Sequence, residues 1–277
     1  MKNYFTAPLL RARLRAVFAL SVFAALFPAS GGLFADSDRF AVPMRIEGAD
    51  LYTRIYIHGG GTEDRNGDSY ARTRYLRVNG EYQFNSWLGF NASFGRSVYD
   101  RTNAAQIWEY DRLGLGVKAR GKLGAGPGAI ALGGGLKLFD RIRSPQQRAD
   151  VDNELLLIRG HLAGAVRLGG IELGVEIRHE SETNEKFREN YDQEFRRHWQ
   201  YGFSLSVPRG KRMRFFFETV YREPDDIAVD DTRFWQFYPG ISLNLSRYLE
   251  IRASLVIPVR KGYEDRGVDF GLMIFLD

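Results

Sequence analysis

The sequence predicts an all-β chain that closes into one antiparallel, up-and-down barrel of about 12 strands and crosses a membrane. Three observations lead to this prediction. Apolar and polar residues alternate with a period of two in segment after segment from Leu51 onward. The connections between these segments are alternately short and long, and a segment typical of exported proteins precedes them.

Residues 1–35 have the features of a secretory signal peptide. Four Lys and Arg residues precede an apolar run at 16–27, and small residues follow it up to Ala35. A transmembrane helix needs about 20 apolar residues, so this run is too short to anchor the chain. We expect cleavage after Ala35, with Gly32 and Ser30 as alternatives, and a single barrel domain over 36–277.

Charge and composition limit the possible partners. The full chain has a formal net charge of +5, but residues 1–35 hold four of its cations and none of its acids, which leaves 35 Lys and Arg against 34 Asp and Glu. We therefore expect no nucleic acid partner. The absence of Cys excludes disulfides, a Cys nucleophile and Cys-ligated metals. Acidic loops lack the full calcium spacing, and glycine runs lack a following helix, so no metal or cofactor is expected.

The strands are predicted from alternation, which is clearest at 172–178, 202–207 and 250–257. Strict alternation is typical of strands that have one apolar and one polar face. The predicted strands are 50–58, 70–84, 87–97, 106–120, 129–139, 153–168, 171–181, 197–207, 213–222, 232–245, 249–260 and 267–276.

The connections fall into two classes that alternate along the chain. The short ones are 85–86, 121–128, 169–170, 208–212 and 246–248; the long, charged ones are 59–69, 98–105, 140–152, 182–196, 223–231 and 261–266. Short turns on one side and long loops on the other are typical of barrels in bacterial outer membranes. A soluble two-sheet sandwich also alternates, but it would leave unguarded edge strands, so closure is favoured.

The tryptophans support a membrane position. All four lie near predicted strand ends, where interfacial girdles of aromatic residues are found: Trp87, Trp108, Trp199 and Trp235. On the fourth strand Trp108 and Tyr110 are out of phase with Leu113. A β-bulge near Asp111 would restore the phase.

These features together resemble a Gram-negative-type outer-membrane β-barrel. The resemblance rests on the alternating strands, the hairpin at 82–94 (YQFNSWLGFNASF) and the closing strand 268–276. By strand number the chain is similar to the small twelve-stranded porins and to outer-membrane phospholipase A. The resemblance implies outer-membrane localisation, outer-membrane lipid as surroundings and insertion by the barrel-assembly machinery. The chain departs from the usual pattern at its end, where Leu276-Asp277 replaces a final aromatic residue.

The polar faces of the strands are assigned to the lumen. They carry 13 cationic against 7 acidic groups, whereas the six outer loops carry 19 acidic against 10 basic residues. Small inward residues such as Gly89, Gly95, Gly114 and Ser204 leave room for a narrow water path. The predicted lumen-lining residues are Arg54, Arg77, Arg112, Lys118, Arg120, Lys137, Arg159, Arg167, Arg178, Arg214, Arg222, Arg252, Arg260, Glu81, Glu172, Glu176, Glu180, Glu218, Glu250 and Asp269.

A basic lumen favours a narrow porin or channel with a preference for small anionic solutes. The alternative is that the charges are structural struts in a closed barrel, which could also serve as a surface adhesin through loop 182–196. A further alternative is an enzyme. His179 and Ser181 lie two apart, so both face lipid, as in outer-membrane lipid hydrolases that use a His-x-Ser pair. A third polar group from Asn190, Gln193 or Glu194 could orient the imidazole.

Overall fold

The computed structural model describes residues 40–66, 69–102, 106–143, 154–183, 197–210, 212–224, 234–259 and 266–276. Their regular structure consists of antiparallel strands. No helix among these residues is long and apolar enough to cross a membrane. The strands are β1 (Arg54–Asn66), β2 (Ser69–Gln83), β3 (Leu88–Arg101), β4 (Ile107–Leu123), β5 (Ile130–Arg143), β6 (Glu154–Leu168), β7 (Ile171–Thr183), β8 (Arg197–Arg209), β9 (Met213–Pro224), β10 (Phe234–Ser246), β11 (Leu249–Pro258) and β12 (Arg266–Phe275).

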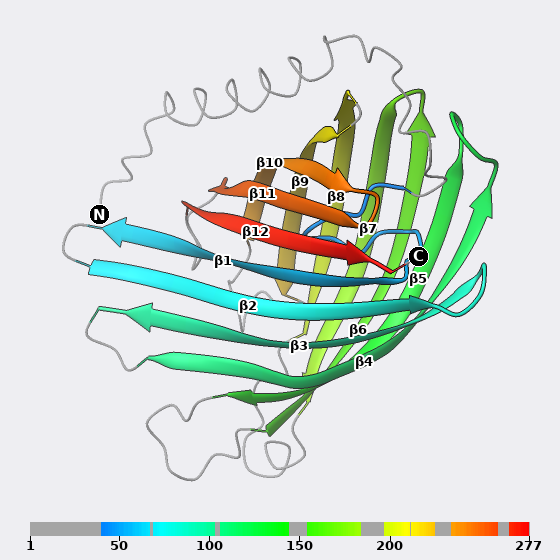
Figure 1. Ribbon diagram of the computed structural model, residues 1–277. Coiled ribbons are helices and arrows are strands. Elements are labelled where there is room, and N and C mark those ends of the chain that lie inside the picture. The colour runs from blue at the N-terminus through cyan, green and yellow to red at the C-terminus, as the bar shows by residue number, and fades with distance from the viewer. Residues whose placement is uncertain are drawn as a thin grey trace.

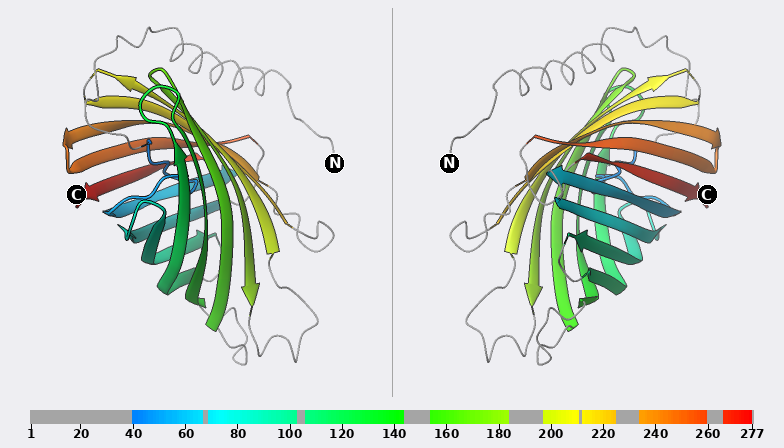
Figure 2. Two further views of the ribbon diagram at one scale, coloured as in Figure 1. Left: turned by 90° about the vertical axis from the view of Figure 1, so that its right-hand side faces the viewer. Right: turned by 90° about the vertical axis from the view of Figure 1, so that its left-hand side faces the viewer.

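The strands form a closed barrel in which each pairs with its neighbours in sequence and β12 pairs with β1 (Figure 1, Figure 2). The closing register runs from Arg54 opposite Phe275 to Glu63 opposite Arg266. Closure gives every strand two hydrogen-bonded partners, which is the condition for a sheet to exist in lipid. The predicted closed barrel of 12 strands is confirmed.

Most strand bounds lie within a few residues of the predicted ones, and the short predicted turns connect the strands at one end of the barrel. The first strand is the exception. It begins at Arg54 and not at residue 50, because residues 50–53 belong to a segment inside the barrel. The strands also extend further toward the long connections than predicted, as β1 does to Asn66.

Burial is inverted relative to a soluble protein. Large apolar side chains are exposed on the outer wall, for example Leu76, Leu162 and Phe270 at 58%, 70% and 58%. Charged side chains such as Lys118 and Glu218 are almost fully buried in the interior. This pattern is expected of a barrel whose outer face contacts lipid and whose inner face is polar.

The phase break predicted on β4 is a β-bulge. The register of β4 with β5 shifts between Asp111 and Leu113, and the shift leaves Asp111 buried while Arg112 and Leu113 are both exposed. Arg112 therefore departs from the predicted lumenal position. It pairs with Asp140 at 2.7 Å, and the two side chains are 39% and 48% exposed.

Residues 40–53, which we call the inner segment, lie within the ring of strands (Figure 1, Figure 2). Phe40, Val42 and Ile46 are each about 95% buried, and Leu51 and Tyr52 are 1% exposed. The inner segment passes the middle of the barrel wall and returns to the short-turn end, where β1 begins. The lumen of this barrel is therefore occupied by its own chain.

Candidate functional site

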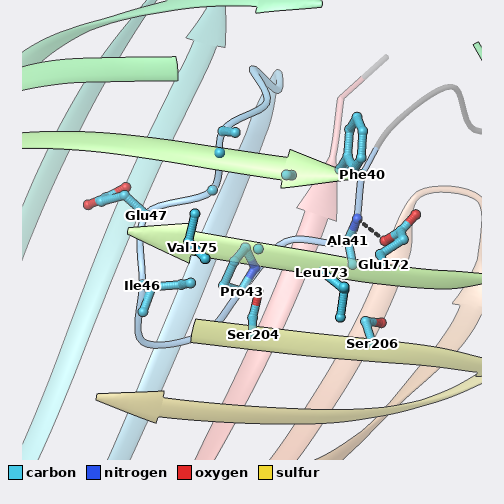
Figure 3. A pocket seen from close by; sticks show the side chains of 15 residues that line it. Phe40, Ala41, Pro43, Ile46, Glu47, Glu172, Leu173, Val175, Ser204 and Ser206 are labelled. Atoms are coloured by element: carbon cyan, nitrogen blue, oxygen red, sulfur yellow. Dashed lines mark hydrogen bonds between the residues drawn. The ribbon is translucent and has the colours of Figure 1, made fainter. Parts of the chain in front are cut away.

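The lumen around the inner segment is the candidate site, and lumenal carboxylates hold the segment's backbone there. Glutamates on β7 and β9 accept hydrogen bonds from its N–H groups: Met44 and Arg45 donate to Glu218 (2.6 and 2.8 Å), Glu47 to Glu176 (2.8 Å) and Ala41 to Glu172 (2.5 Å, Figure 3). Hydrogen bonds to a charged partner contribute about 1.5–3 kcal/mol each. These four hydrogen bonds recognise the backbone of the segment and not its side chains.

Ion pairs add two further tethers. Arg45 donates through Nε to Asp269 of β12 at 2.7 Å, and the same carboxylate accepts from the Tyr75 hydroxyl. Asp50 is fully buried and pairs with Arg120 of β4. Both acids are neutralised by these cations, as buried charges require. The inner segment is therefore anchored at its middle and near its return to the barrel end.

The apolar contacts of the inner segment are small and separate. Phe40 and Ala49 pack on alanines of the β5 and β6 region, Val42 and Tyr52 pack near Met273, and Ile46 packs near Val220. A pocket remains between the segment and strands β6 to β8, lined in part by Pro43, Ser204 and Ser206 (Figure 3). The contact surface behind the segment is mixed, with serine and glutamate side chains beside the apolar ones.

Inward glycines give the inner segment its space. The sequence suggested that small inward residues such as Gly89 leave a water path, but in this structure Gly89 and two other inward glycines lie against the segment. A Cβ added to the wall glycines would meet segment atoms: Gly89 would meet Leu51 at 3.0 Å, Gly133 the carbonyl oxygen of Ala49 at 2.5 Å, and Gly202 would collide with Ile46. Gly89 therefore accommodates protein where a water path was predicted, whereas a Cβ at Gly95 or Gly114 would meet side chains of the wall.

The predicted lumenal charges of the wall form a network of ion pairs. Each pair joins an inward cation to an inward acid: Arg54 and Lys118 to Glu81, Arg167 and Arg214 to Glu172, Arg178 to Glu176, Arg159 to Glu180, and Arg252 to Glu250. Arg222 contacts His198 at 2.8 Å. Arg260 lies outside the described residues. Such pairing offsets part of the free-energy cost of burying these charges.

Two lumenal cations differ from the rest. Arg77 has a buried Nε without a hydrogen-bond partner in the described part of the chain. Lys137 is 8% exposed, and its Nζ lies 5.0 Å from the ring centroid of Phe139. Neither residue forms an ion pair with a wall carboxylate among the described contacts.

Sequence reasoning missed several residues of the lumen. The inner segment was overlooked, although Phe40, Val42, Met44 and Ile46 alternate with polar or small residues as a strand would. That alternation indicates an ordered segment but does not place it inside the barrel. Arg141, assigned to a loop, is in fact buried and bonds Asp111 at 2.5 Å.

The possible hydrolase pair lies on the outer face of β7, as its parity requires. The described neighbours of His179 across the sheet are Gly160 and Trp199, and its ring centroid lies 4.7 Å from that of Trp199. Opposite Ser181 are Ile158 and Arg197. Asn190, Gln193 and Glu194, the suggested third group, lie outside the described residues. The described neighbours thus provide no carboxylate or amide directly across the strands from His179.

The four tryptophans lie on the outer wall near strand ends. Trp87, Trp199 and Trp235 are 57%, 39% and 44% exposed, and Trp108 is half-buried. The indole N–H of Trp235 donates to Thr219 Oγ1 at 2.7 Å. An indole whose N–H is hydrogen-bonded and whose ring is apolar is well suited to the membrane interface.

No known protein family matches the sequence, and no curated protein is similar to it. Solved structures are similar in fold. An outer-membrane channel from Pseudomonas putida F1 has a TM-score of 0.57 at 12% identity, covering 85% of this chain and 99% of that one. The translocator domain of the autotransporter NalP from Neisseria meningitidis has 0.51 at 15%, covering 97% of both chains. The KdgM porin in complex with disordered oligogalacturonate has 0.52 at 10%, covering 80% and 99%. These likenesses show the fold of a 12-stranded outer-membrane barrel.

Proposed function

We propose that this protein is an outer-membrane channel for small solutes, with a preference for anions, and that the inner segment holds it closed. The observation that carries the proposal is the position of residues 40–53 inside a charged barrel, tethered to wall carboxylates through backbone N–H groups. Export with a signal peptide at 1–35 and insertion by the barrel-assembly machinery into outer-membrane lipid belong to the same proposal.

The tethers favour a reversible closure over a permanent core. Water can replace the backbone N–H groups at Glu172, Glu176 and Glu218, because hydrogen bonds exchange between protein and water with a modest net change in free energy. The wall behind the segment includes Ser204 and Ser206. Water can hydrate the polar side chains of such a wall after the segment leaves. Withdrawal of the segment would therefore leave a hydrated passage.

The anion preference follows from the surplus of lumenal cations. Most wall cations share a wall carboxylate, whereas Arg77 and Lys137 do not form such a pair among the described contacts. A narrow passage selects ions through the charge and the hydrogen-bond donors of its lining. Fixed lumenal cations that share no wall carboxylate attract small anions and repel cations.

Single-channel recording in planar bilayers tests this proposal. We expect the full mature barrel to be closed for most of the time, with brief openings. Deletion of residues 40–49 should produce sustained openings, and a salt gradient should give a reversal potential of anion-selective sign. The deletion variant must still be folded, which its heat-modifiable migration on gels reports. Absence of conductance steps in both proteins, or a cation preference, would refute the channel.

A further inference from the structure

A cluster of cationic side chains faces the lumen at the level of the inner segment's bend. Lys118 of β4 lies opposite Gly135 of β5, Gly135 lies opposite His161 of β6, and His161 lies opposite Arg178 of β7. These four positions form one continuous row across neighbouring strands. Residues opposite one another in a sheet have Cβ atoms about 4.5–5.5 Å apart. The row therefore presents three cationic or titratable side chains around one glycine.

The glycine leaves space within this row, and Lys137 borders that space. A Cβ at Gly135 would lie 2.7 Å from Cε1 of His161, so the imidazole covers the glycine. His161 Nε2 is buried without a hydrogen-bond partner in the described part of the chain. Lys137 follows two residues after Gly135 and so points to the same side of β5. Lys137 and His161 thus both lie beside Gly135, and Nε2 of His161 has no hydrogen-bond partner in the described part of the chain.

The acids of the wall do not balance these cations. Glu176 bonds Arg178 at 2.6 Å, and Glu81 lies 3.5 Å from Lys118 but also bonds Arg54. Neither acid forms an ion pair with Lys137 among the described contacts. Buried charges need compensation from nearby opposite charge.

Glu47 of the inner segment supplies the compensating charge. Its N–H is fixed by Glu176, and its side chain points away from Pro43 (Figure 3). Burial alone would raise the pKa of Glu47. The charges of His161, Arg178, Lys118 and Lys137 outweigh burial and hold that pKa well below its usual range. The N–H of Glu47 is tied to the same Glu176 that bonds Arg178 at 2.6 Å, so its carboxylate lies beside the cluster and within the field of these cations.

We propose that the cluster of Lys118, Lys137, His161 and Arg178 is a binding site for small carboxylate solutes, occupied by Glu47 while the barrel is closed. This inference rests on the proposed channel function and names its solute class. When the inner segment withdraws, the cluster loses its carboxylate and becomes available to one from solution. Glu47 and the solute then compete for the same cations, so a bound solute also keeps the segment out.

The site suits a carboxylate for two reasons of chemistry. The guanidinium of Arg178 can donate to a planar oxygen pair, and ammonium groups on β4 and β5 add point charges from the other side. The imidazole of His161 can donate a hydrogen bond from a ring nitrogen to a carboxylate oxygen. A spherical anion such as chloride engages fewer of these directed donors. We therefore expect carboxylates to bind more tightly than chloride at equal ionic strength.

The test compares Glu47→Gln with a matched variant of the same segment, Asp50→Asn. Both substitutions remove one carboxylate and loosen one tether, but Asp50 pairs with Arg120, which is not a member of the cluster. Single-channel currents of each full-length variant are recorded in chloride, and acetate or glucuronate is then added at constant ionic strength. We expect both variants to open more often than the wild type. Carboxylate should interrupt the currents of Glu47→Gln at concentrations about tenfold lower than those needed for Asp50→Asn, in which Glu47 still competes for the cluster.

A third variant checks the site itself. Adding Lys137→Met to Glu47→Gln should abolish the interruptions by carboxylate while the double variant still conducts. Thermal unfolding followed by gel migration gives a readout independent of conductance, because a ligand that binds only the folded barrel raises its midpoint. Glucuronate should raise the midpoint of Glu47→Gln and not that of the double variant.

The outcomes separate this inference from the channel proposal. Equal sensitivity of Glu47→Gln and Asp50→Asn to carboxylate, with both conducting, would overturn the carboxylate site and leave the channel intact. Equal interruption by acetate and extra chloride would also overturn it. If no protein conducts, the channel proposal fails; a midpoint of Glu47→Gln that carboxylate does not raise would then overturn the binding site as well.

Discussion

Glu218 makes the most consequential single contact of the inner segment, and replacing it with glutamine should open the channel. The glutamate is 1% exposed and accepts from two successive N–H groups, those of Met44 and Arg45, at 2.6 and 2.8 Å. The glutamine side chain has the same shape, but it has only one acceptor oxygen and carries no charge. The loss of one charge-assisted bond, about 1.5–3 kcal/mol, raises the population of the withdrawn segment about 10- to 150-fold.

The assay is the open probability of single channels in a planar bilayer. Glu180→Gln serves as the control, because Glu180 is also a buried lumenal glutamate but accepts from Arg159 at 2.5 Å and lies near His198. Its substitution disturbs the barrel interior but removes none of the tethers described above for the segment, so open probability should stay near that of the wild type. Equal open probability in Glu218→Gln and wild type, with both folded, would refute the tether argument. An equal increase of open probability in Glu218→Gln and Glu180→Gln would contradict a specific role of Glu218 as a tether.

Three further predictions concern the same lumen. Gly202→Val should expel the segment, because even a Cβ there collides with Ile46, while Gly160→Ala, with open space around it, should leave gating unchanged in the same recordings. Lys137→Met should reduce the anion preference in reversal-potential measurements, whereas Arg112→Met should not, since Arg112 pairs with Asp140 and is 39% exposed. Lowering the pH should also favour opening. The docked Glu47 has a pKa well below the value of about 4.3 expected when it is released, so docking weakens by up to about 1.4 kcal/mol per unit as pH falls below about 4. Glu47→Gln should show a smaller rise in openings over that range; an identical pH profile would contradict this account of Glu47.

Local patterns were sufficient to predict the barrel. Period-two alternation and turn lengths are properties of neighbouring residues, and the bulge on β4 followed from the phase of Tyr110 against Leu113 alone. The same bulge shows the limit of parity, because one extra residue moved Arg112 out of the predicted lumenal set. Parity predicts a face only as far as the next irregularity.

The inner segment could not be predicted in the same way because its contacts are distant in sequence. Met44 and its acceptor Glu218 are 174 residues apart, and Ala41 and Glu172 are 131 apart. Nothing in residues 40–53 distinguishes a lumenal segment from an additional strand, since both alternate. The inward glycines had two readings, space for water or space for chain, and the folded lumen supports the second at Gly89, Gly133 and Gly202.

A reversible cross-link between the inner segment and the wall tests the central claim most directly. Ala49 of the segment and Ala131 of β5 pack in one cluster, and the chain has no cysteine of its own. Ala49→Cys and Ala131→Cys would be introduced together into Glu218→Gln, whose channel we expect to open often. Single-channel recording should show no openings while the disulfide is formed and frequent openings after a reductant is added to the same bilayer. Undiminished conductance through the oxidised protein would contradict the claim that residues 40–53 close this barrel.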